Sequence, residues 1–177
     1  MIRDLSYIDR PAGFDPASLG REPFLLRPGH FAVVDGDTIW ALSTSGRGRG
    51  ERDRMSFSMR FRSIAAPERP MRRATDRVLS KSGVDPYWDH AGRRATDLLK
   101  TYMDRRALLV QPTGRIDPYG RMLCDMSVVP YTGRNPDLAR AISLERLMLD
   151  REVVTPFGRE VPPSVRPQIP DTPATLG

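Results

Sequence analysis

The first strong signal of regular structure in the chain is Phe31-Ala32-Val33-Val34-Asp35-Gly36-Asp37-Thr38-Ile39-Trp40-Ala41-Leu42. Residues 31–34 and 38–42 are rich in β-branched, aromatic and aliphatic side chains and flank an Asp-Gly-Asp turn, which predicts two consecutive strands. Residues 56–62 alternate between apolar and polar side chains, and this alternation predicts a half-buried third strand. One face of that strand is expected to carry Phe57, Met59 and Phe61, and the other Ser58, Arg60 and Arg62.

Two helices and two more strands are expected after this first group. Apolar residues recur at helical spacing within residues 90–105, and Asp89 is the candidate N-cap. Residues 108–110 and 122–129 predict the fourth and fifth strands, and Asn135-Pro136-Asp137 is a typical helix start. The residues expected to be buried are Leu98, Leu99 and Met103 in the first helix, and Leu138, Ile142, Leu147 and Leu149 in the second.

The predicted order is three strands, a helix, two strands and a helix. This α+β order suits a small closed β-barrel with two or three helices packed against it. Residues 31–154 hold all these elements and form the predicted domain. Residues 1–30 carry scattered prolines and glycines and are expected to form an irregular N-terminal arm. Residues 155–177 are proline-rich and are expected to be an extended or disordered tail, because proline has no amide hydrogen for helix or sheet pairing.

The charge is uneven along the 177-residue chain. It carries 28 Lys and Arg against 22 Asp and Glu, a net charge of +6. Residues 47–106 hold 16 of the basic and 8 of the acidic residues, so this segment is net +8 and the remainder is net −2. A basic segment on a near-neutral remainder favours a polyanionic partner. A membrane is not expected as a partner, since no apolar run approaches the roughly 20 residues of a spanning helix.

Cys124 is the only cysteine of the chain, so no internal disulfide forms. It lies in an apolar segment and is expected to be a core residue. The first ten residues contain no apolar run of the kind found in a secretory signal peptide, and a cytoplasmic location is therefore expected.

Four short motifs follow one another along the chain. They are Val33-Val34-Asp35-Gly36-Asp37-Thr38, Arg60, Ala65-Ala66-Pro67-Glu68 and Asp117-Pro118-Tyr119-Gly120-Arg121. In this order and separation, over roughly residues 31–153, the chain resembles the staphylococcal nuclease (thermonuclease) family. The resemblance implies a five-stranded barrel of the oligonucleotide-binding (OB) type and a phosphodiesterase activity of the endo- or exonuclease kind.

The resemblance also implies catalytic roles for three residues. Arg60 and Arg121 match the arginines that grip the scissile phosphate, and a planar guanidinium binds two phosphate oxygens at once, which lysine does not. Glu68 matches the carboxylate that activates or positions the attacking water.

The metal implied by the resemblance is Ca²⁺, with Mg²⁺ as the alternative. The implied ligands are the Asp37 carboxylate and the backbone carbonyl of Ala66, and Asp35 supports the site through water. The family's second metal carboxylate lies where this chain has Ala65. Because Ca²⁺ usually takes six to eight oxygen ligands, the loss of one carboxylate predicts weaker metal binding.

The expected partner is DNA, with RNA as a further nucleic-acid partner, and the oligomeric state is left open. Affinity is expected mainly from the basic windows 47–54 and 69–81, which are net +2 and +4. Tyr119 matches a family tyrosine near the bound phosphate. The residues expected to contact nucleic acid are Tyr119, Arg47, Arg49, Arg72, Arg73 and Arg77.

Three functions stay open at this point. The first is a metal-dependent nuclease that hydrolyses phosphodiester bonds with low sequence specificity, because phosphates carry no sequence information. The second is a non-catalytic nucleic-acid-binding module on the same fold, with Ala65 marking lost chemistry. The third is a protein-interaction domain in which the proline-rich tail is the working part.

Overall fold

The computed structural model describes residues 2–7, 14–43, 54–66, 86–131 and 135–157, with the side chains of residues 86–90 outside this description. The strands are β1 (Arg3–Asp4), β2 (Phe24–Leu26), β3 (Phe31–Asp35), β4 (Thr38–Leu42), β5 (Met55–Phe61), β6 (Ile64–Ala65), β7 (Ala107–Ile116), β8 (Met122–Val129), β9 (Ile142–Ser143) and β10 (Thr155–Pro156). The α-helices are α1 (Pro86–Met103) and α2 (Leu144–Asp150), and the 3-10 helices are η1 (Leu5–Tyr7), η2 (Pro16–Leu19) and η5 (Leu138–Arg140).

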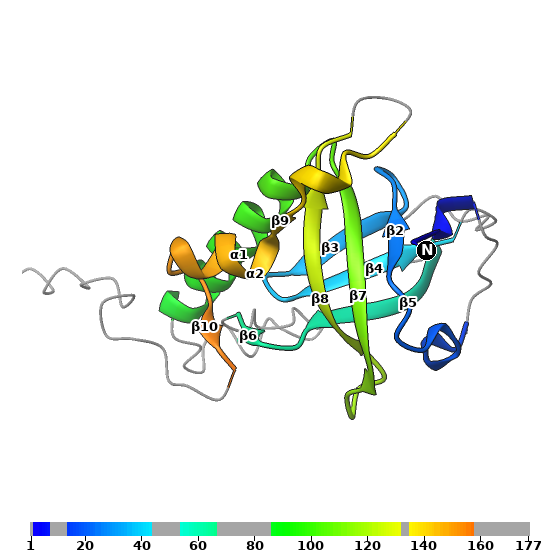
Figure 1. The fold of residues 1–177 in the computed structure, drawn as a ribbon. Coiled ribbons are helices and arrows are strands. Elements are labelled where there is room, and N and C mark those ends of the chain that lie inside the picture. Colours follow the sequence, from blue (N-terminus) through cyan, green and yellow to red (C-terminus); the bar gives the residue numbers. More distant parts are fainter. Residues whose placement is uncertain (1, 8–13, 44–53, 67–85, 132–134, 158–177) are drawn as a thin grey trace, which may run out of the picture.

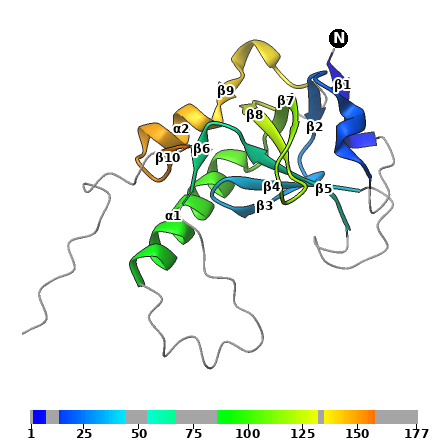
Figure 2. The ribbon, with the colours of Figure 1, turned by 90° about the horizontal axis from the view of Figure 1, so that it is seen from below.

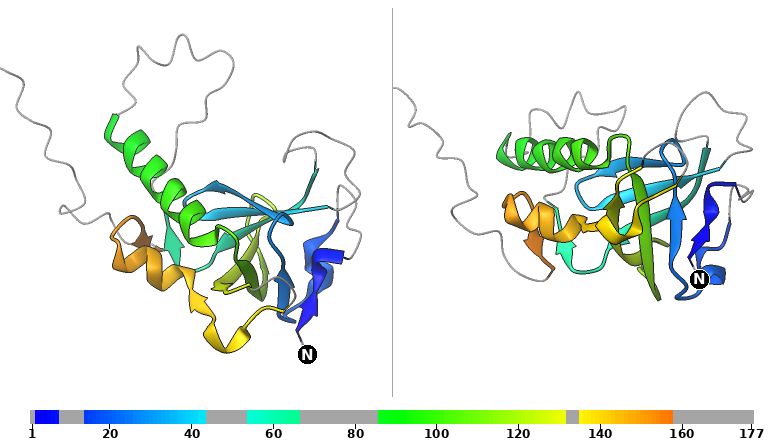
Figure 3. Two further views of the ribbon diagram at one scale, coloured as in Figure 1. Left: turned by 90° about the horizontal axis from the view of Figure 1, so that it is seen from above. Right: turned by 45° about the horizontal axis from the view of Figure 1, so that its top comes forward.

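The main sheet has the strand order β1-β2-β7-β8-β5-β4-β3, and β9 pairs with β8 as an eighth strand. Strand β5 lies inside the sheet, antiparallel to β4 and parallel to β8. Strands β6 and β10 form a separate antiparallel pair. The predicted α+β class is confirmed, and the two helices lie at one end of the sheet with the N-terminal elements at the other (Figures 1 and 3). The strand pairings among the described residues do not close the sheet into a barrel, because the two strands at its edges, β1 and β3, do not pair with each other.

All five predicted strands are present and adjacent, as β7-β8-β5-β4-β3. The alternating pattern of β5 predicted one buried face, and this is confirmed, because Phe57, Met59 and Phe61 are buried in the core. Strand β7 is longer than the predicted 108–110, because its antiparallel pairing with β8 continues past an irregularity between Pro112 and Ile116.

The N-terminal segment 1–30 contains regular structure where an irregular arm was expected. Strand β2 is wholly buried and pairs with β7, so Phe24 and Leu26 join the main core. Arg27 fixes this segment by donating from Nε to Asp4 Oδ2 at 2.7 Å and from Nη1 to the Tyr131 hydroxyl at 3.0 Å. Prolines 23 and 28 flank β2 and mask its strand signal in the sequence.

Helix α1 packs one face against the sheet and lies beside β3 (Figure 2). Ala95, Leu99 and Met103 are buried, and Leu98 is partly buried against them, as the helical spacing predicted. The helix begins at Pro86 rather than at the expected Asp89 cap, because proline's fixed φ suits the first helical turn.

The helix expected from residue 135 is wrong in its start and in half of its buried face, since Leu147 and Leu149 do pack, partly buried, against the core. Leu138 and Ile142 are exposed, and β9 separates η5 from the short helix α2. The side chain of Ser143 accepts a hydrogen bond from the Arg146 amide and caps α2. The buried residues of α2 are therefore Leu144 and Met148.

The core extends from Leu5 in the N-terminal elements, along the sheet, to the two helices, and it includes Cys124, which is fully buried as expected. Burial raises the pKa of its thiol, so Cys124 stays protonated and unreactive. Within the described part of the chain, no helix combines the length and the apolar character needed to cross a bilayer.

Candidate functional site

The sheet register brings the Asp-Gly-Asp turn next to Arg60. Asp35 ends β3 and lies opposite Thr38, the first residue of β4. Thr38 in turn lies opposite Arg60 on β5, and Arg60 lies opposite Leu123 on β8. Asp37, Thr38 and Arg60 thus come together at one end of three neighbouring strands, beside the residue that precedes β8, Arg121.

Gly36 allows this turn to pack against α1. A Cβ atom added at this position would lie 2.6 Å from the Cβ of Ala95 and 2.7 Å from the Cβ of Ala66. Both distances are shorter than real carbon contacts, so only glycine fits between the helix and Ala66 without a shift. The close packing fixes the positions of Asp35 and Asp37 relative to the helix.

The Asp37 side chain is buried and accepts three hydrogen bonds. Its Oδ2 accepts from Arg60 Nη2 at 3.0 Å and from the Ala66 amide at 3.2 Å. Its Oδ1 accepts from the Thr38 hydroxyl at 2.9 Å. Asp37 is 5% exposed, so this arrangement holds a charged pair largely out of water.

Arg121 reaches the same place from the turn between β7 and β8. Its Nη1 donates to Thr38 Oγ1 at 3.3 Å, and its Nε donates to Asp117 Oδ2 at 2.7 Å. Asp117 Oδ1 accepts from the amides of Tyr119 and Arg121 at 2.8 and 2.9 Å. These bonds outweigh the effect of burial and lower the pKa of Asp117, so this carboxyl is ionised at neutral pH.

We name this group of residues the Asp37 cluster. Its members are Asp35, Asp37, Thr38, Arg60, Asp117 and Arg121. The two guanidinium groups meet the Asp37–Thr38 pair from separate elements, and Ala66 joins through its amide. Other residues expected in the site or in nucleic-acid contact lie outside the described residues: Glu68, Arg47, Arg49, Arg72, Arg73 and Arg77.

Asp35 is the electrostatically strained member of the Asp37 cluster. Burial and the neighbouring charge of Asp37 raise the pKa of Asp35 from its ordinary value of 3.8 to about 6. Its Oδ1 accepts a hydrogen bond from the Asp37 amide at 3.2 Å, which offsets this in part. A cation near both carboxylates would relieve their repulsion.

The described residues do not by themselves form a calcium site. No three His, Cys, Asp or Glu side chains among them gather closely enough to hold a metal ion. Asp37 already accepts three hydrogen bonds, one of them from Arg60, and Ala65 brings no carboxylate. The Ala66 amide lies beside Asp37, to which it donates a hydrogen bond, and Ala65 pairs with Thr155 of β10. The Ala66 carbonyl, which is the expected metal ligand, stays a prediction.

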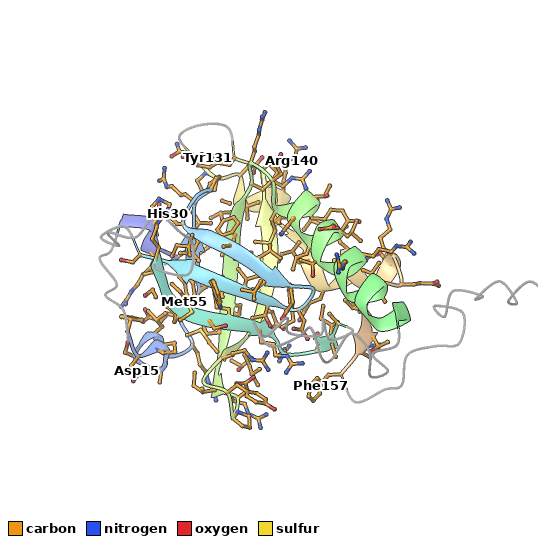
Figure 4. All side chains as sticks on the ribbon, turned by 180° about the vertical axis from the view of Figure 1, so that it is seen from behind. Asp15, His30, Met55, Tyr131, Arg140 and Phe157 are labelled. Carbon is orange, nitrogen blue, oxygen red and sulfur yellow. The ribbon has the colours of Figure 1, made fainter. Side chains whose placement is uncertain are left out.

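Two exposed aromatic rings flank the two arginines. Tyr119 is 82% exposed, and Arg121 Cζ lies 5.1 Å from its ring centroid. Phe157 is 63% exposed, and Arg60 Cζ lies 5.6 Å from its ring centroid. Figure 4 shows Phe157 at the margin of the domain, next to the end of β10.

Phe157 was missed by the sequence analysis, which placed it in the proline-rich tail. The β6–β10 pairing and a hydrogen bond of 2.8 Å from its amide to the Ser63 carbonyl bring it beside Arg60. No signal within residues 155–157 predicts these long-range contacts.

No protein-family model matches the chain, and a search of curated proteins gives no match either. The function proposed below therefore rests on the residues of the Asp37 cluster and their geometry.

Proposed function

We propose that the chain binds the phosphodiester backbone of nucleic acid at the Asp37 cluster and hydrolyses it as a metal-dependent nuclease, with DNA as the first substrate and RNA as the second. The observation that carries the proposal is the convergence of Arg60 and Arg121 on the Asp37–Thr38 pair. This is the chemistry implied by the resemblance to the staphylococcal nuclease family.

The two guanidinium groups suit a phosphodiester in geometry and in charge. Each presents planar donors that can bind two phosphate oxygens, and charge-assisted bonds of this kind are about twice as strong as neutral ones. Arg60 Nε is buried and has no hydrogen-bond partner among the described residues, so its donor is not satisfied there. Hydrolysis builds negative charge on the phosphoryl oxygens, and fixed donors stabilise that charge.

The charge balance supports a cation as part of the proposed site. When all are ionised, the three aspartates of the Asp37 cluster outnumber its two arginines, and a phosphodiester adds a further negative charge. With the phosphodiester bound, the sum is −2, so binding of Ca²⁺, with Mg²⁺ as the alternative, restores the balance, whereas protonation of Asp35 offsets only one of the two charges. A divalent cation has to compete with Arg60 for Asp37, so the metal requirement is expected to be high.

The finer fold proposal is a barrel of the OB type. Strands β2 and β3 are separated by the four residues Arg27 to His30, with Gly29 at a φ of +86°. Strand β2 pairs with β7 and β3 pairs with β4. If β2 and β3 are the two halves of one bent strand, that strand pairs with β7 through β2 and with β4 through β3. It would then join the first and last strands of the order β7-β8-β5-β4-β3, and this supports a closed five-stranded barrel.

The test is a cleavage assay with purified protein on plasmid and single-stranded DNA, in Ca²⁺, in Mg²⁺ and in chelator. We expect metal-dependent cleavage that Arg121→Lys reduces more than it reduces DNA affinity, because a point charge does not replace the planar fork. Arg115→Lys is the matched control, since Arg115 is exposed on the same hairpin and makes no side-chain contact with the Asp37 cluster within the described residues.

A second function, non-catalytic nucleic-acid binding, is favoured by the Asp37–Arg60 ion pair together with Ala65. The ion pair occupies the carboxylate that a metal would use, and Ala65 supplies no replacement. In the same assay this function predicts DNA binding that Arg121→Lys weakens, without cleavage in any metal. A wild type that neither binds nor cleaves DNA contradicts both functions.

A further inference from the structure

Among the described residues, the hydrogen bonds of the Asp117 carboxylate all go to its own turn. Its Oδ1 accepts from the amides of Tyr119 and Arg121, and its Oδ2 accepts from Arg121 Nε. The side chain of Asp117 is 8% exposed, so water competes little for these bonds. One oxygen therefore fixes the backbone of the turn and the other fixes the guanidinium.

Asp117 Oδ2 also sets the direction of the guanidinium. With Nε bonded to Asp117, the other end of the planar group carries Nη1, which donates to Thr38 Oγ1 at 3.3 Å. The Thr38 hydroxyl in turn donates to Asp37. The Arg121 guanidinium is therefore held between Asp117 on one side and Thr38 on the other, next to Asp37. An arginine side chain has several rotatable bonds, and fixing it in advance removes an entropic cost from ligand binding.

We propose that Asp117 is a positioning residue, which acts through Arg121 by holding its guanidinium in place for phosphate before the ligand arrives. The expected effect of Asp117 on nucleic-acid binding and cleavage rests on the proposed function. The orientation of Arg121 is a property of the free protein and can be measured without either.

Asp117→Asn separates the two roles of the carboxylate. The amide oxygen of asparagine can still accept from the Tyr119 and Arg121 amides, so the turn is retained. Its NH₂ group then faces Arg121 Nε, and two donors repel each other. Asp137→Asn is the matched control, because Asp137 is exposed and makes no capping hydrogen bond.

The first measurement is NMR of arginine Nε–H groups in the wild-type protein without ligand. We expect the Arg121 Nε–H to exchange with water at least about tenfold more slowly than that of the exposed Arg115, because it is bonded to a buried carboxylate. Equal exchange rates overturn the proposal, and this result needs no variant.

The second measurement is a double-mutant cycle with a fluorescein-labelled single-stranded oligonucleotide, read as affinity and, where cleavage occurs, as kcat and KM. Asp117→Asn is expected to weaken binding or lower kcat about tenfold in the wild-type background, and less than about twofold in an Arg121→Ala background. If Asp117→Asn lowers affinity or kcat equally in both backgrounds, the proposal is overturned, because the effect of Asp117 then does not depend on Arg121. If the wild type neither binds nor cleaves the oligonucleotide, the proposed function fails, and the Nε–H exchange alone decides the positioning role.

Discussion

Replacing Asp35 by asparagine should stabilise the protein at neutral pH and leave it nearly unchanged at acidic pH. The ionised carboxylate of Asp35 is half-buried next to Asp37, which raises its pKa to about 6. A group with a raised pKa contributes stability below its unfolded pKa, and that contribution is lost as the pH rises through the folded value. Wild type therefore loses stability between about pH 4 and pH 7, and asparagine, which stays neutral, does not.

The size of the effect follows from the pKa of Asp35. A rise from 3.8 to about 6 corresponds to about 3 kcal/mol, at about 1.36 kcal/mol per pKa unit, and this is the upper end of the expected gain. Asparagine keeps an oxygen that can accept from the Asp37 amide, as Asp35 Oδ1 does at 3.2 Å. The gain therefore reflects the removed charge rather than a lost hydrogen bond.

The assay is urea unfolding at about pH 4.5 and about pH 7.5, followed by the fluorescence of the two tryptophans, Trp40 and Trp88, for wild type, Asp35→Asn and Asp137→Asn. Asp137 is exposed, so its substitution controls for the loss of one negative charge. The reasoning is refuted if Asp35→Asn destabilises the protein at pH 7.5, or if its effect is the same at both pH values. Added Ca²⁺ should stabilise wild type more than Asp35→Asn, because the cation relieves the same repulsion.

Three further predictions concern the packing, the rings and the metal. Gly36→Ala should lower the free energy of unfolding by about 1–3 kcal/mol in the same urea assay, because its methyl meets Ala95, and an unchanged stability contradicts the packing described. Phe157→Ala should weaken binding of a single-stranded oligonucleotide about tenfold in fluorescence anisotropy without loss of stability, because Phe157 is 63% exposed and its ring can stack on a base. Unchanged affinity removes Phe157 from the site. Ala65→Asp should tighten Ca²⁺ binding in calorimetry by restoring a carboxylate, and no change means that Ala65 is misplaced in the site.

The parts of the fold that the sequence predicted are those with a local periodic signal. The alternation in residues 56–62 predicted β5 and the burial of Phe57 and Met59, because side chains on a strand point to opposite faces in turn. The apolar spacing of α1 predicted the burial of Leu99. Strand β2 was missed because a strand of three residues is too short to show a period, and it is recognised only by its pairing with β7.

In the candidate site, too, the local motifs identified residues, whereas the long-range contacts between them were not predicted. The motif order identified Asp37, Arg60 and Arg121, which the sheet register brings together. The ion pair between Asp37 and Arg60 was not predicted, because no sequence motif states which partner a carboxylate takes when several donors surround it. Phe157 was missed since its place beside Arg60 depends on the distant β6–β10 pairing.

The most direct test of the central claim is a crystal structure of the protein with a short oligonucleotide whose linkages resist hydrolysis. We predict that one phosphate lies within hydrogen-bond distance, about 3 Å, of both the Arg60 and the Arg121 guanidinium groups. A phosphate bound to only one of these arginines, or an oligonucleotide bound away from the Asp37 cluster, would contradict the account.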